Sequence, residues 1–538
     1  MYQDREDVWE SLSDGNKGPW DVIVVGGGIT GAGVLREAAR MGLKALLIEQ
    51  RDFAWGTSSR SSKMVHGGLR YLAQGDLKLT RHSLHERERL LKEAPGLVDR
   101  MSYYMMLRRG QFPGRWAMKV ILTIYDFIAG VKDNRYCDRD TVNELFPGIN
   151  NKKLLGASYY TDAVTDDARL VLRVLQEALK SEGESRICAL NYVKAQKLVQ
   201  SAGRVSGLLV EDVETGRTLE LEASVVINAT GSWADRLRNE VNSEQRVRPL
   251  RGSHLVISRH RLPMIAAANF INLKDKRPVF IYPWEGATVV GTTDLDHSDD
   301  MDVEASITTE ELDYLLQLVD DQFPDNNITS DDIIATFAGV RPVISSENSS
   351  HSNSMKPSSE RRDHAVWCDA GLITVSGGKL TTFRLIARDA IEAAQPWLLG
   401  AGRQSCDNTI FSATQTNPVE LFSDDLSRSV RLLGRYGDYS AQMIDEAASA
   451  EKTKIGDTEY CLAECRWAVR NESVLHLDDL MLRRTRLGIL LKHGGAELFS
   501  VLREIFAEEK GWGCERWERE KERYMNIWRQ YYFLPQSC

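Results

Sequence analysis

The sequence lacks any run of about 18 apolar residues, the length that a helix needs to cross the hydrocarbon core of a membrane. Its first twenty residues are polar and acidic, without the basic start and apolar centre of a signal peptide. These absences argue against a membrane-spanning helix and against secretion. They leave contact with a membrane surface open.

Cysteine is sparse, and basic charge is outweighed by acidic charge. The eight cysteines are scattered, with no CxxC pair, so a compact disulfide framework is excluded. Cys461 and Cys465 stand four residues apart, but no histidine lies at a ligand spacing nearby, and we expect no metal site. A reduced, intracellular compartment fits this cysteine usage. The net charge of -9 argues against nucleic acid as a partner, so any basic patch must be local and suited to a small anion.

One glycine-rich segment carries the pattern of a dinucleotide site. The apolar run 21–25 meets the fingerprint Gly26-x-Gly28-x-x-Gly31, then a helical pattern, and a second apolar run ends at Glu49. The first glycine permits the turn, the second lets the backbone approach a pyrophosphate, and the third allows close packing of helix and strand. An acid at the end of the second strand accepts hydrogen bonds from ribose hydroxyls.

The rest of the chain favours FAD over NAD as the dinucleotide. Residues 194–222 read as a β-meander, which is followed by a buried strand and the turn Ala229-Thr230-Gly231. That arrangement is common in flavoproteins. No second GxGxxG within its own βαβ unit appears, so a separate NAD domain is not expected. We therefore predict non-covalently bound FAD as the only dinucleotide.

Several long segments resemble the FAD-dependent glycerol-3-phosphate dehydrogenases of the aerobic, quinone-linked type. The resemblance spans nearly the whole chain and rests on these stretches: FAWGTSSRSSKMVHGGLRYL (53–72), YTDAVTDDARLV (160–171), VINATGSWAD (226–235), RGSHLVIS (251–258), YPWEGATVVGTTD (282–294), FAGVRP (337–342), SGGKLTTFR (376–384) and WAVRNESVLHLDDLMLRRTRL (467–487). Glycerol-3-phosphate oxidases, which pass electrons to oxygen, are the close relatives with a different acceptor, and these motifs do not separate the two.

The resemblance implies an α/β fold. It consists of a Rossmann-type, glycine-oxidase-like FAD-binding domain, an antiparallel-sheet substrate cap and an all-α C-terminal domain. We expect residues 1–19 to be a flexible leader. Residues 20–400 are expected to hold the FAD-binding and cap domains as discontinuous pieces, and residues 401–538 the helical domain.

The same resemblance implies oxidation of sn-glycerol 3-phosphate to dihydroxyacetone phosphate, with electrons passed to a quinone. An oxygen-using oxidase and a flavin-binding sensor or scaffold without turnover are the alternatives. The residues carried over as substrate-binding are Arg70, Tyr71, Arg341, Arg362 and Lys379, with Arg361 a rival for the role of Arg362. Those expected to hold the cofactor are Gly26, Gly28, Gly31, Glu49, Ser62, Lys63, Gly231, Gly378, Leu380 and Thr381.

The chemistry of oxidising a phosphorylated alcohol suggests a role for several of these residues. A phosphate dianion needs several cationic donors, which the arginines and Lys379 supply. The alcohol needs a base, and His66 and His254 are both candidates. Arg341 can instead hold the developing alkoxide, so the catalytic set is His66, His254, Arg341 and Lys379. A helix predicted from Leu380 to Ala390 would direct its N-terminus at the reduced flavin.

A quinone acceptor implies a cytoplasmic protein held peripherally at the inner face of the cell membrane. Residues 115–130 offer a candidate contact, with the rings of Trp116 and Tyr125 at the interface and Arg108, Arg109, Arg115, Lys119 and Lys132 around them. A core helix of the cap is the alternative interpretation of this segment. The oligomeric state stays open, with a homodimer as one alternative.

Overall fold

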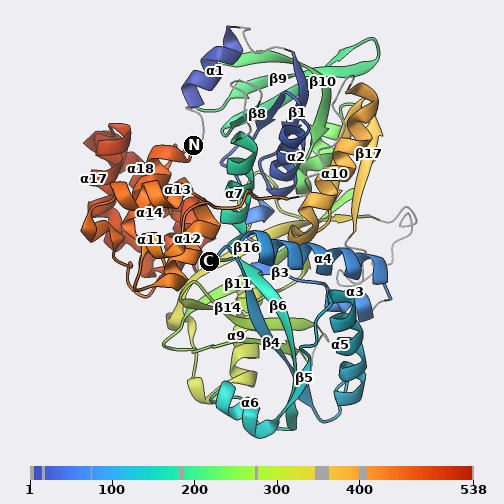
Figure 1. The fold of residues 1–538 in the computed structure, drawn as a ribbon, viewed down its shortest axis with the longest axis vertical. Helices are drawn as coiled ribbons and strands as arrows, with labels where there is room; N and C mark the ends of the chain where they lie inside the picture. Colours follow the sequence, from blue (N-terminus) through green and yellow to red (C-terminus); the bar gives the residue numbers. More distant parts are fainter. Residues whose placement is uncertain are drawn as a thin grey trace.

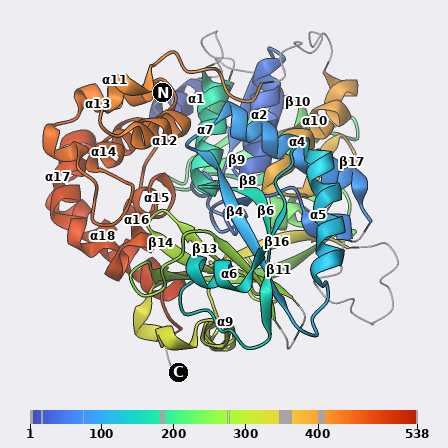
Figure 2. The same ribbon diagram turned by 60° about the horizontal axis from the view of Figure 1, so that its bottom comes forward.

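The computed structural model describes residues 5–14, 19–73, 75–180, 187–272, 275, 277–345, 363–398 and 409–535. Two sheets lie one above the other in Figure 1, and a group of helices from the C-terminal part of the chain lies beside both. Figure 2 shows the same helices from another side, again grouped apart from the strands.

The first sheet is built on parallel strands. Its order is β17-β18-β10-β1-β2-β7, and β8 and β9 extend from β10 as an antiparallel meander. The strands are β1 (Trp20–Val25), β2 (Ala45–Ile48), β7 (Ile187–Leu190), β8 (Val193–Ser201), β9 (Arg204–Asp212), β10 (Thr218–Asn228), β17 (His364–Asp369) and β18 (Leu372–Gly377). The predicted strand–turn–helix–strand unit is β1, α2 (Ile29–Arg40) and β2, and the predicted meander is confirmed.

Helices α2, α7 (Asp167–Leu179) and α10 (Phe383–Ala394) pack together and share one core with this sheet. The neighbouring parallel strands β1 and β2 are almost entirely apolar and buried because both faces of the sheet are covered there, as parallel sheets require. The short helix α8 (Ala234–Arg238) follows β10.

The prediction of a flexible leader at 1–19 is wrong for the residues described there. Arg5–Ser13 form α1, which buries Val8, Trp9 and Leu12 in the core on the other side of the first sheet. Arg5 also bonds Asp212 at the end of β9. The polar composition concealed this helix because only three of its nine residues are apolar and buried.

The second sheet is antiparallel apart from the β12–β4 pair. Its order is β15-β11-β14-β13-β12-β4-β6-β3, with β16 paired to β11 and β5 to β6. The strands are β3 (Met64–Val65), β4 (Val98–Arg108), β5 (Arg135–Asp138), β6 (Leu154–Thr165), β11 (Val247–Ser258), β12 (Ala267–Ile271), β13 (Pro278–Trp284), β14 (Ala287–Gly291), β15 (Leu295–Asp296) and β16 (Ile333–Ile344). The helices of this part are α3 (Leu69–Ala73), α4 (Leu77–Glu93), α5 (Arg115–Ala129), α6 (Arg139–Leu145) and α9 (Thr309–Gln322).

Helix α5 lies on the outside of the molecule, at the right-hand edge of Figure 1. Trp116 is exposed, as predicted for an interfacial ring, whereas Tyr125 is buried and donates a hydrogen bond to Asp162. The prediction that Tyr125 lies at the interface is therefore wrong. Helical spacing places the two residues on different faces, because nine residues are two and a half turns.

The C-terminal part is helical, as predicted. Its helices are α11 (Pro418–Leu421), α12 (Leu426–Tyr436), α13 (Tyr439–Glu446), α14 (Leu462–Asn471), α15 (Leu477–Asp479), α16 (Leu487–Leu490), α17 (Phe499–Lys510) and α18 (Cys514–Tyr531). Asp52, which follows β2, accepts hydrogen bonds from the buried guanidinium groups of Arg483 and Arg484. These ion pairs fasten the helical part to the first sheet.

Within the described ranges, no helix combines the length and the apolar character that crossing a membrane requires.

Candidate active site

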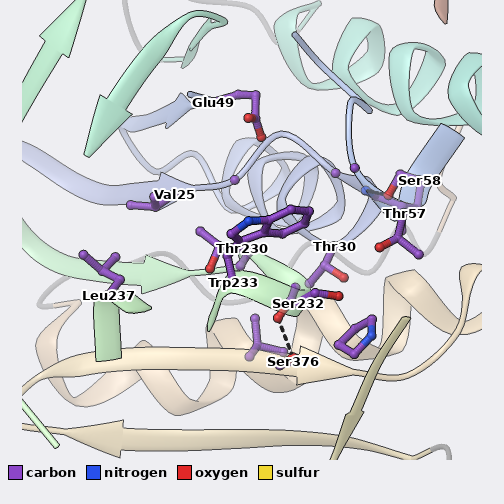
Figure 3. A pocket seen from close by; sticks show the side chains of 18 of the residues that line it. Val25, Thr30, Glu49, Thr57, Ser58, Thr230, Ser232, Trp233, Leu237 and Ser376 are labelled. Atoms are coloured by element: carbon purple, nitrogen blue, oxygen red, sulfur yellow. Dashed lines mark hydrogen bonds between the residues drawn. The ribbon is translucent and has the colours of Figure 1, made fainter. Parts of the chain in front are cut away.

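A cavity of about 410 Å³ lies where the parallel strands of the first sheet end. The carboxyl ends of such strands form a crevice in which doubly wound sheets bind nucleotides. Figure 3 shows Val25 at the end of β1, Thr230 and Trp233 after β10, and Ser376 near the end of β18 around this space. Segments far apart in the sequence therefore line one cleft.

The three fingerprint glycines are required for three different physical reasons. Gly26 has a φ of +113°, and a β-carbon there would lie 2.6 Å from the carbonyl oxygen of Ala229. At Gly31 a β-carbon would lie 1.9 Å from the oxygen of Gly26, so any side chain would separate the helix from the turn. Gly28 lines the cavity with no side chain between its backbone and a ligand. The predicted turn, packing and close approach are all present in the geometry.

Glu49 projects into the cavity immediately after β2 (Figure 3). Its carboxylate accepts hydrogen bonds from the backbone N–H groups of Gly27, at 2.7 Å, and Arg51, at 2.9 Å. Burial raises the pKa of Glu49. Two backbone donors hold the carboxylate in place, and each oxygen keeps a second lone pair for a ribose hydroxyl.

On the opposite wall of the cavity, Gly377 and Gly378 both adopt a φ of +80°. This left-handed backbone turns the chain from β18 into a 3₁₀ turn, Leu380–Thr382, and then into α10. The predicted helix from Leu380 therefore begins as a 3₁₀ turn and continues to Ala394. Gly378, Lys379 and Leu380 line the cavity, and so does Gly231.

Lys379 joins the cofactor cavity to the predicted substrate residues. Its Nζ lies 3.5 Å from the centroid of the Tyr71 ring and donates to Ser83 Oγ at 3.1 Å. Tyr71 is on α3 and Ser83 on α4 of the cap, whereas Lys379 follows the last strand of the first sheet. A cation is thus held between the two parts of the molecule, beside the cofactor cleft.

Arg341 and His254 lie on the paired strands β16 and β11. Arg341 Nη2 donates to the carbonyl oxygen of Thr293 at 3.0 Å and lies 3.5 Å from a carboxylate oxygen of Asp294. Pro342, the next residue, lines the cofactor cavity. The register sets Arg341 opposite Leu250 and His254 opposite Phe337, so the two predicted catalytic residues lie on neighbouring strands, four positions apart.

His254 is buried, with its ring stacked on Phe337 at a centroid distance of 4.5 Å. Its Nε2 lies 2.9 Å from Ser62 Oγ. Burial, together with the positive charges of Lys63 and Arg341, holds the pKa of His254 well below its ordinary value. The imidazole is therefore neutral at pH 7 and carries a lone pair that can accept a proton.

Three other predicted residues occupy different surroundings. His66 is tied through its backbone, because its N–H donates to Thr381 Oγ1 at 3.1 Å. Lys63 is buried with its Nζ 2.9 Å from Asp167, and burial with the nearby Arg486 lowers the pKa of Lys63 to about 7. The ammonium of Lys63 thus faces Asp167, and neither its side chain nor that of Ser62 lines the cavity.

The structure does not describe the side chains of three arginines named in the sequence analysis. Arg70 lies on α3, next to Tyr71, but its side-chain position is not described. Arg361 and Arg362 fall in 346–362, outside the described residues, so their roles stay predictions.

Three supporting contacts were not predicted from the sequence. Ser83 bonds Lys379, Ser58 Oγ accepts from the Ile29 N–H at the start of α2, and Asp162 accepts from the Gly67 N–H. Asp162 stands inside a segment that carried the family resemblance, which is the one signal that marked it. Ser58 likewise lies in a segment that carried the resemblance, 53–72, whereas Ser83 lies outside every such segment.

The cavity fits a dinucleotide with a flavin. It has the open glycine backbone for a pyrophosphate, a fixed acid for a ribose, and a glycine-lined wall that leads to two cations.

Comparisons with known proteins agree with this fit. The profile of a family described as FAD dependent oxidoreductase matches residues 21–391. A second profile, described as the C-terminal domain of alpha-glycerophosphate oxidase, matches residues 395–517. The chain is 33% identical to the aerobic glycerol-3-phosphate dehydrogenase of Bacillus subtilis, covering 88% of each chain. It is 31% identical to the alpha-glycerophosphate oxidase of Streptococcus pneumoniae, covering 94% of each.

Solved structures show the same relationship. A glycerol-3-phosphate dehydrogenase from Bacillus halodurans, complexed with FAD, is similar with a TM-score of 0.75 and 26% identity over 98% of each chain. A glycine oxidase from Geobacillus kaustophilus is similar with a TM-score of 0.51 and 18% identity, over 74% of this chain and 99% of that one. The second likeness concerns the fold alone and confirms the predicted glycine-oxidase-like architecture.

Proposed function

We propose that this chain, which belongs to the FAD-dependent glycerol-3-phosphate dehydrogenase family, oxidises sn-glycerol 3-phosphate to dihydroxyacetone phosphate. The cofactor is FAD. The observation that carries the proposal is the position of Lys379, which lines the FAD cavity and also contacts Tyr71 and Ser83 of the cap. A phosphorylated substrate held there lies directly beside the cofactor.

Phosphate binding is assigned to cations from both parts of the molecule. Lys379 supplies a compact positive charge at the cavity wall, and Arg341 supplies a planar guanidinium from the cap. Charge-assisted hydrogen bonds to phosphate are the stronger kind, and a dianion needs several of them. Arg70 and Arg362 complete the proposed set. This arrangement explains why the phosphate ester, and not free glycerol, is the proposed substrate.

Bound FAD supplies the acceptor for the hydride that leaves C2 of the substrate. We propose that His254 is the general base that accepts the proton of the C2 hydroxyl, because its neutral ring has a lone pair. Arg341 lies close enough to lower the pKa of His254, so the same cation can hold the alkoxide as it develops. Ser62 fixes the ring orientation through its contact with Nε2. His66 is the alternative base.

The electrons are proposed to pass to a quinone at the cytoplasmic face of a membrane, which makes the protein a peripheral one. An oxygen-using oxidase is the second candidate, because an alpha-glycerophosphate oxidase is 31% identical along nearly the whole chain. A homodimer is compatible with either electron acceptor.

One comparison separates these acceptors. The FAD-loaded protein is given glycerol 3-phosphate in air, and reduction of a quinone analogue is measured beside peroxide formation. Quinone reduction that far exceeds peroxide supports the dehydrogenase. Stoichiometric peroxide assigns the oxidase, and glycerol 3-phosphate that yields neither reduced quinone nor peroxide rejects both.

A further inference from the structure

Lys63 is a buried ammonium that the proposed chemistry leaves without a role. Its side chain has no exposed surface, and its Nζ donates to the carbonyl oxygen of Ser59 at 2.8 Å and to the two carboxylate oxygens of Asp167 at 2.9 and 3.0 Å. The same carboxylate accepts from the N–H of Ser61 at 2.9 Å and from its Oγ at 2.8 Å. A buried charge is stable only where it is paired and hydrogen-bonded. Asp167, the first residue of α7, therefore fixes both Ser61 and Lys63.

Ser62 lies between these two residues but contacts a different partner. The backbone of Lys63 has a φ of +59°, a left-handed conformation that residues with side chains adopt rarely and keep only where their surroundings hold it. Its carbonyl oxygen accepts from the N–H of Thr165 at 2.8 Å, which holds that conformation together with Asp167. Ser62 Oγ lies 2.9 Å from His254 Nε2. The turn anchored at Lys63 thus sets the position of the hydroxyl that contacts the proposed base.

Lys63 and His254 also contact the same aromatic ring. His254 on β11 lies opposite Gly291 on β14 and Phe337 on β16. Its imidazole stacks on Phe337 with 10° between the ring planes, and Gly291 has no room for a β-carbon beside it. Lys63 Nζ lies 4.5 Å from the centre of the Phe337 ring. All three side chains are buried, so little water screens the ammonium from the imidazole.

The charges around these two side chains favour a neutral imidazole. Burial, followed by the positive charges of Lys63 and Arg341, lowers the pKa of His254. The other charged groups that face the pair are Asp294 beside Arg341, and Asp166, Asp167 and Arg486 around Lys63. With its own pKa lowered by burial to about 7, Lys63 keeps its charge through the acidic range in which an ordinary histidine takes up a proton.

We propose that Lys63 is a positioning residue for the oxidation: bound to Asp167, it sets Ser62 against His254, and its charge keeps the imidazole free to accept the proton of the C2 hydroxyl. The proposal rests on the proposed function for the role of His254 as the base. Lys63 then acts through His254, and not through the cofactor contact that the family resemblance implies.

The effect of the charge is tested without turnover, by nuclear magnetic resonance of the FAD-loaded protein labelled with ¹³C at histidine Cε1. The chain has ten histidines, and the signal that His254→Gln removes belongs to His254. We expect the titration midpoint of this signal to lie about one pH unit or more higher in Lys63→Met than in wild type, because a nearby positive charge is lost. Lys44→Met is the control, since Lys44 lies over the Trp20 ring and is not among the groups that shift the pKa of His254. An equal midpoint in wild type and Lys63→Met overturns the proposal.

The positioning is tested with Ser62→Ala, which removes the hydroxyl and keeps Lys63 and its charge. We expect flavin reduction by saturating glycerol 3-phosphate to slow roughly tenfold or more, while the dissociation constant of the substrate, the FAD content and the titration midpoint of His254 stay close to wild type. Reduction at the wild-type rate overturns the proposal, and it does so even if Lys63→Met fails to fold. A wild type whose flavin stays oxidised with glycerol 3-phosphate rejects the proposed function instead, and the titration of His254 then still decides the effect of Lys63.

Discussion

The ammonium of Lys379 lies 3.5 Å from the centre of the Tyr71 ring, and the same residue lines the cofactor cavity. A fixed cation at the boundary between the two sheets explains how one site holds both a cofactor and an anionic substrate. The first prediction concerns this contact.

Lys379→Ala should lower kcat/KM for glycerol 3-phosphate by roughly 10- to 150-fold, the equivalent of about 1.5–3 kcal/mol for a charge-assisted hydrogen bond. Bound FAD per protein should stay close to wild type, because the lysine meets only one wall of the cavity. Lys44→Ala is the matched control, since Lys44 also lies over an aromatic ring, that of Trp20 at 5.1 Å, away from the site. A normal kcat/KM in Lys379→Ala would remove this lysine from the substrate site.

Gly28→Ala should abolish most FAD binding while the chain still folds. The backbone of Gly28, at φ −80° and ψ −175°, accepts alanine, but the methyl group would lie 3.0 Å from Ser58 Oγ, which also lines the cavity, and would crowd the backbone that a pyrophosphate approaches. Gly114 precedes α5 with nearly the same conformation, φ −83° and ψ 176°, and open space around it. Gly114→Ala should therefore keep its FAD. The measurement is the flavin absorbance of each purified protein after normalising to protein concentration.

Asp52→Asn should destabilise the protein by about 3–5 kcal/mol, because the buried guanidinium groups of Arg483 and Arg484 would lose their shared carboxylate. Asp302→Asn removes the exposed partner of Arg236 and should cost no more than about 1 kcal/mol. Urea unfolding followed by circular dichroism compares the two. Equal midpoints would show that the Asp52 pairs do not fasten the helical part to the first sheet.

Stability should fall above neutral pH because of His476. Its hydrogen bonds to Glu214 and Glu520 outweigh burial and raise the pKa of His476 from 6.5 to about 10. The folded protein keeps this proton where the unfolded chain has lost it, so the stabilisation is complete below about pH 6.5 and is lost as the pH rises toward 10. Thermal midpoints measured across this range should fall, and His476→Gln should flatten the decline. A decline of the same slope in the variant would assign it to other groups.

The sequence identified the parts of the fold that depend on local pattern. The turn at Gly26, the acid at Glu49 and the meander after residue 193 each follow from neighbouring residues, so spacing alone predicted them. The family resemblance added Tyr71, Arg341 and Lys379 as substrate residues. Their assigned roles remain proposals, although the geometry brings Tyr71 and Lys379 into contact.

Contacts between residues that are far apart in the sequence could not be predicted from local sequence patterns. Ser83 meets Lys379 across 296 positions, and Asp162 meets Gly67 across 95, with no periodicity to connect them. For Tyr125, the sequence pattern predicted the helix but not which of its faces is buried. Its helix was predicted to contact a membrane, but which face turned inward depended on Asp162, a partner that the helical pattern does not contain.

The most direct test of the account is anaerobic mixing of the FAD-loaded protein with glycerol 3-phosphate, and separately with glycerol, while the flavin absorbance is followed. We expect rapid bleaching by glycerol 3-phosphate at micromolar to millimolar concentration and little or none by glycerol. The Arg341→Ala variant, loaded with FAD, should bleach far more slowly than wild type. Equal bleaching by both alcohols, or an oxidised flavin after prolonged exposure to glycerol 3-phosphate, would contradict it.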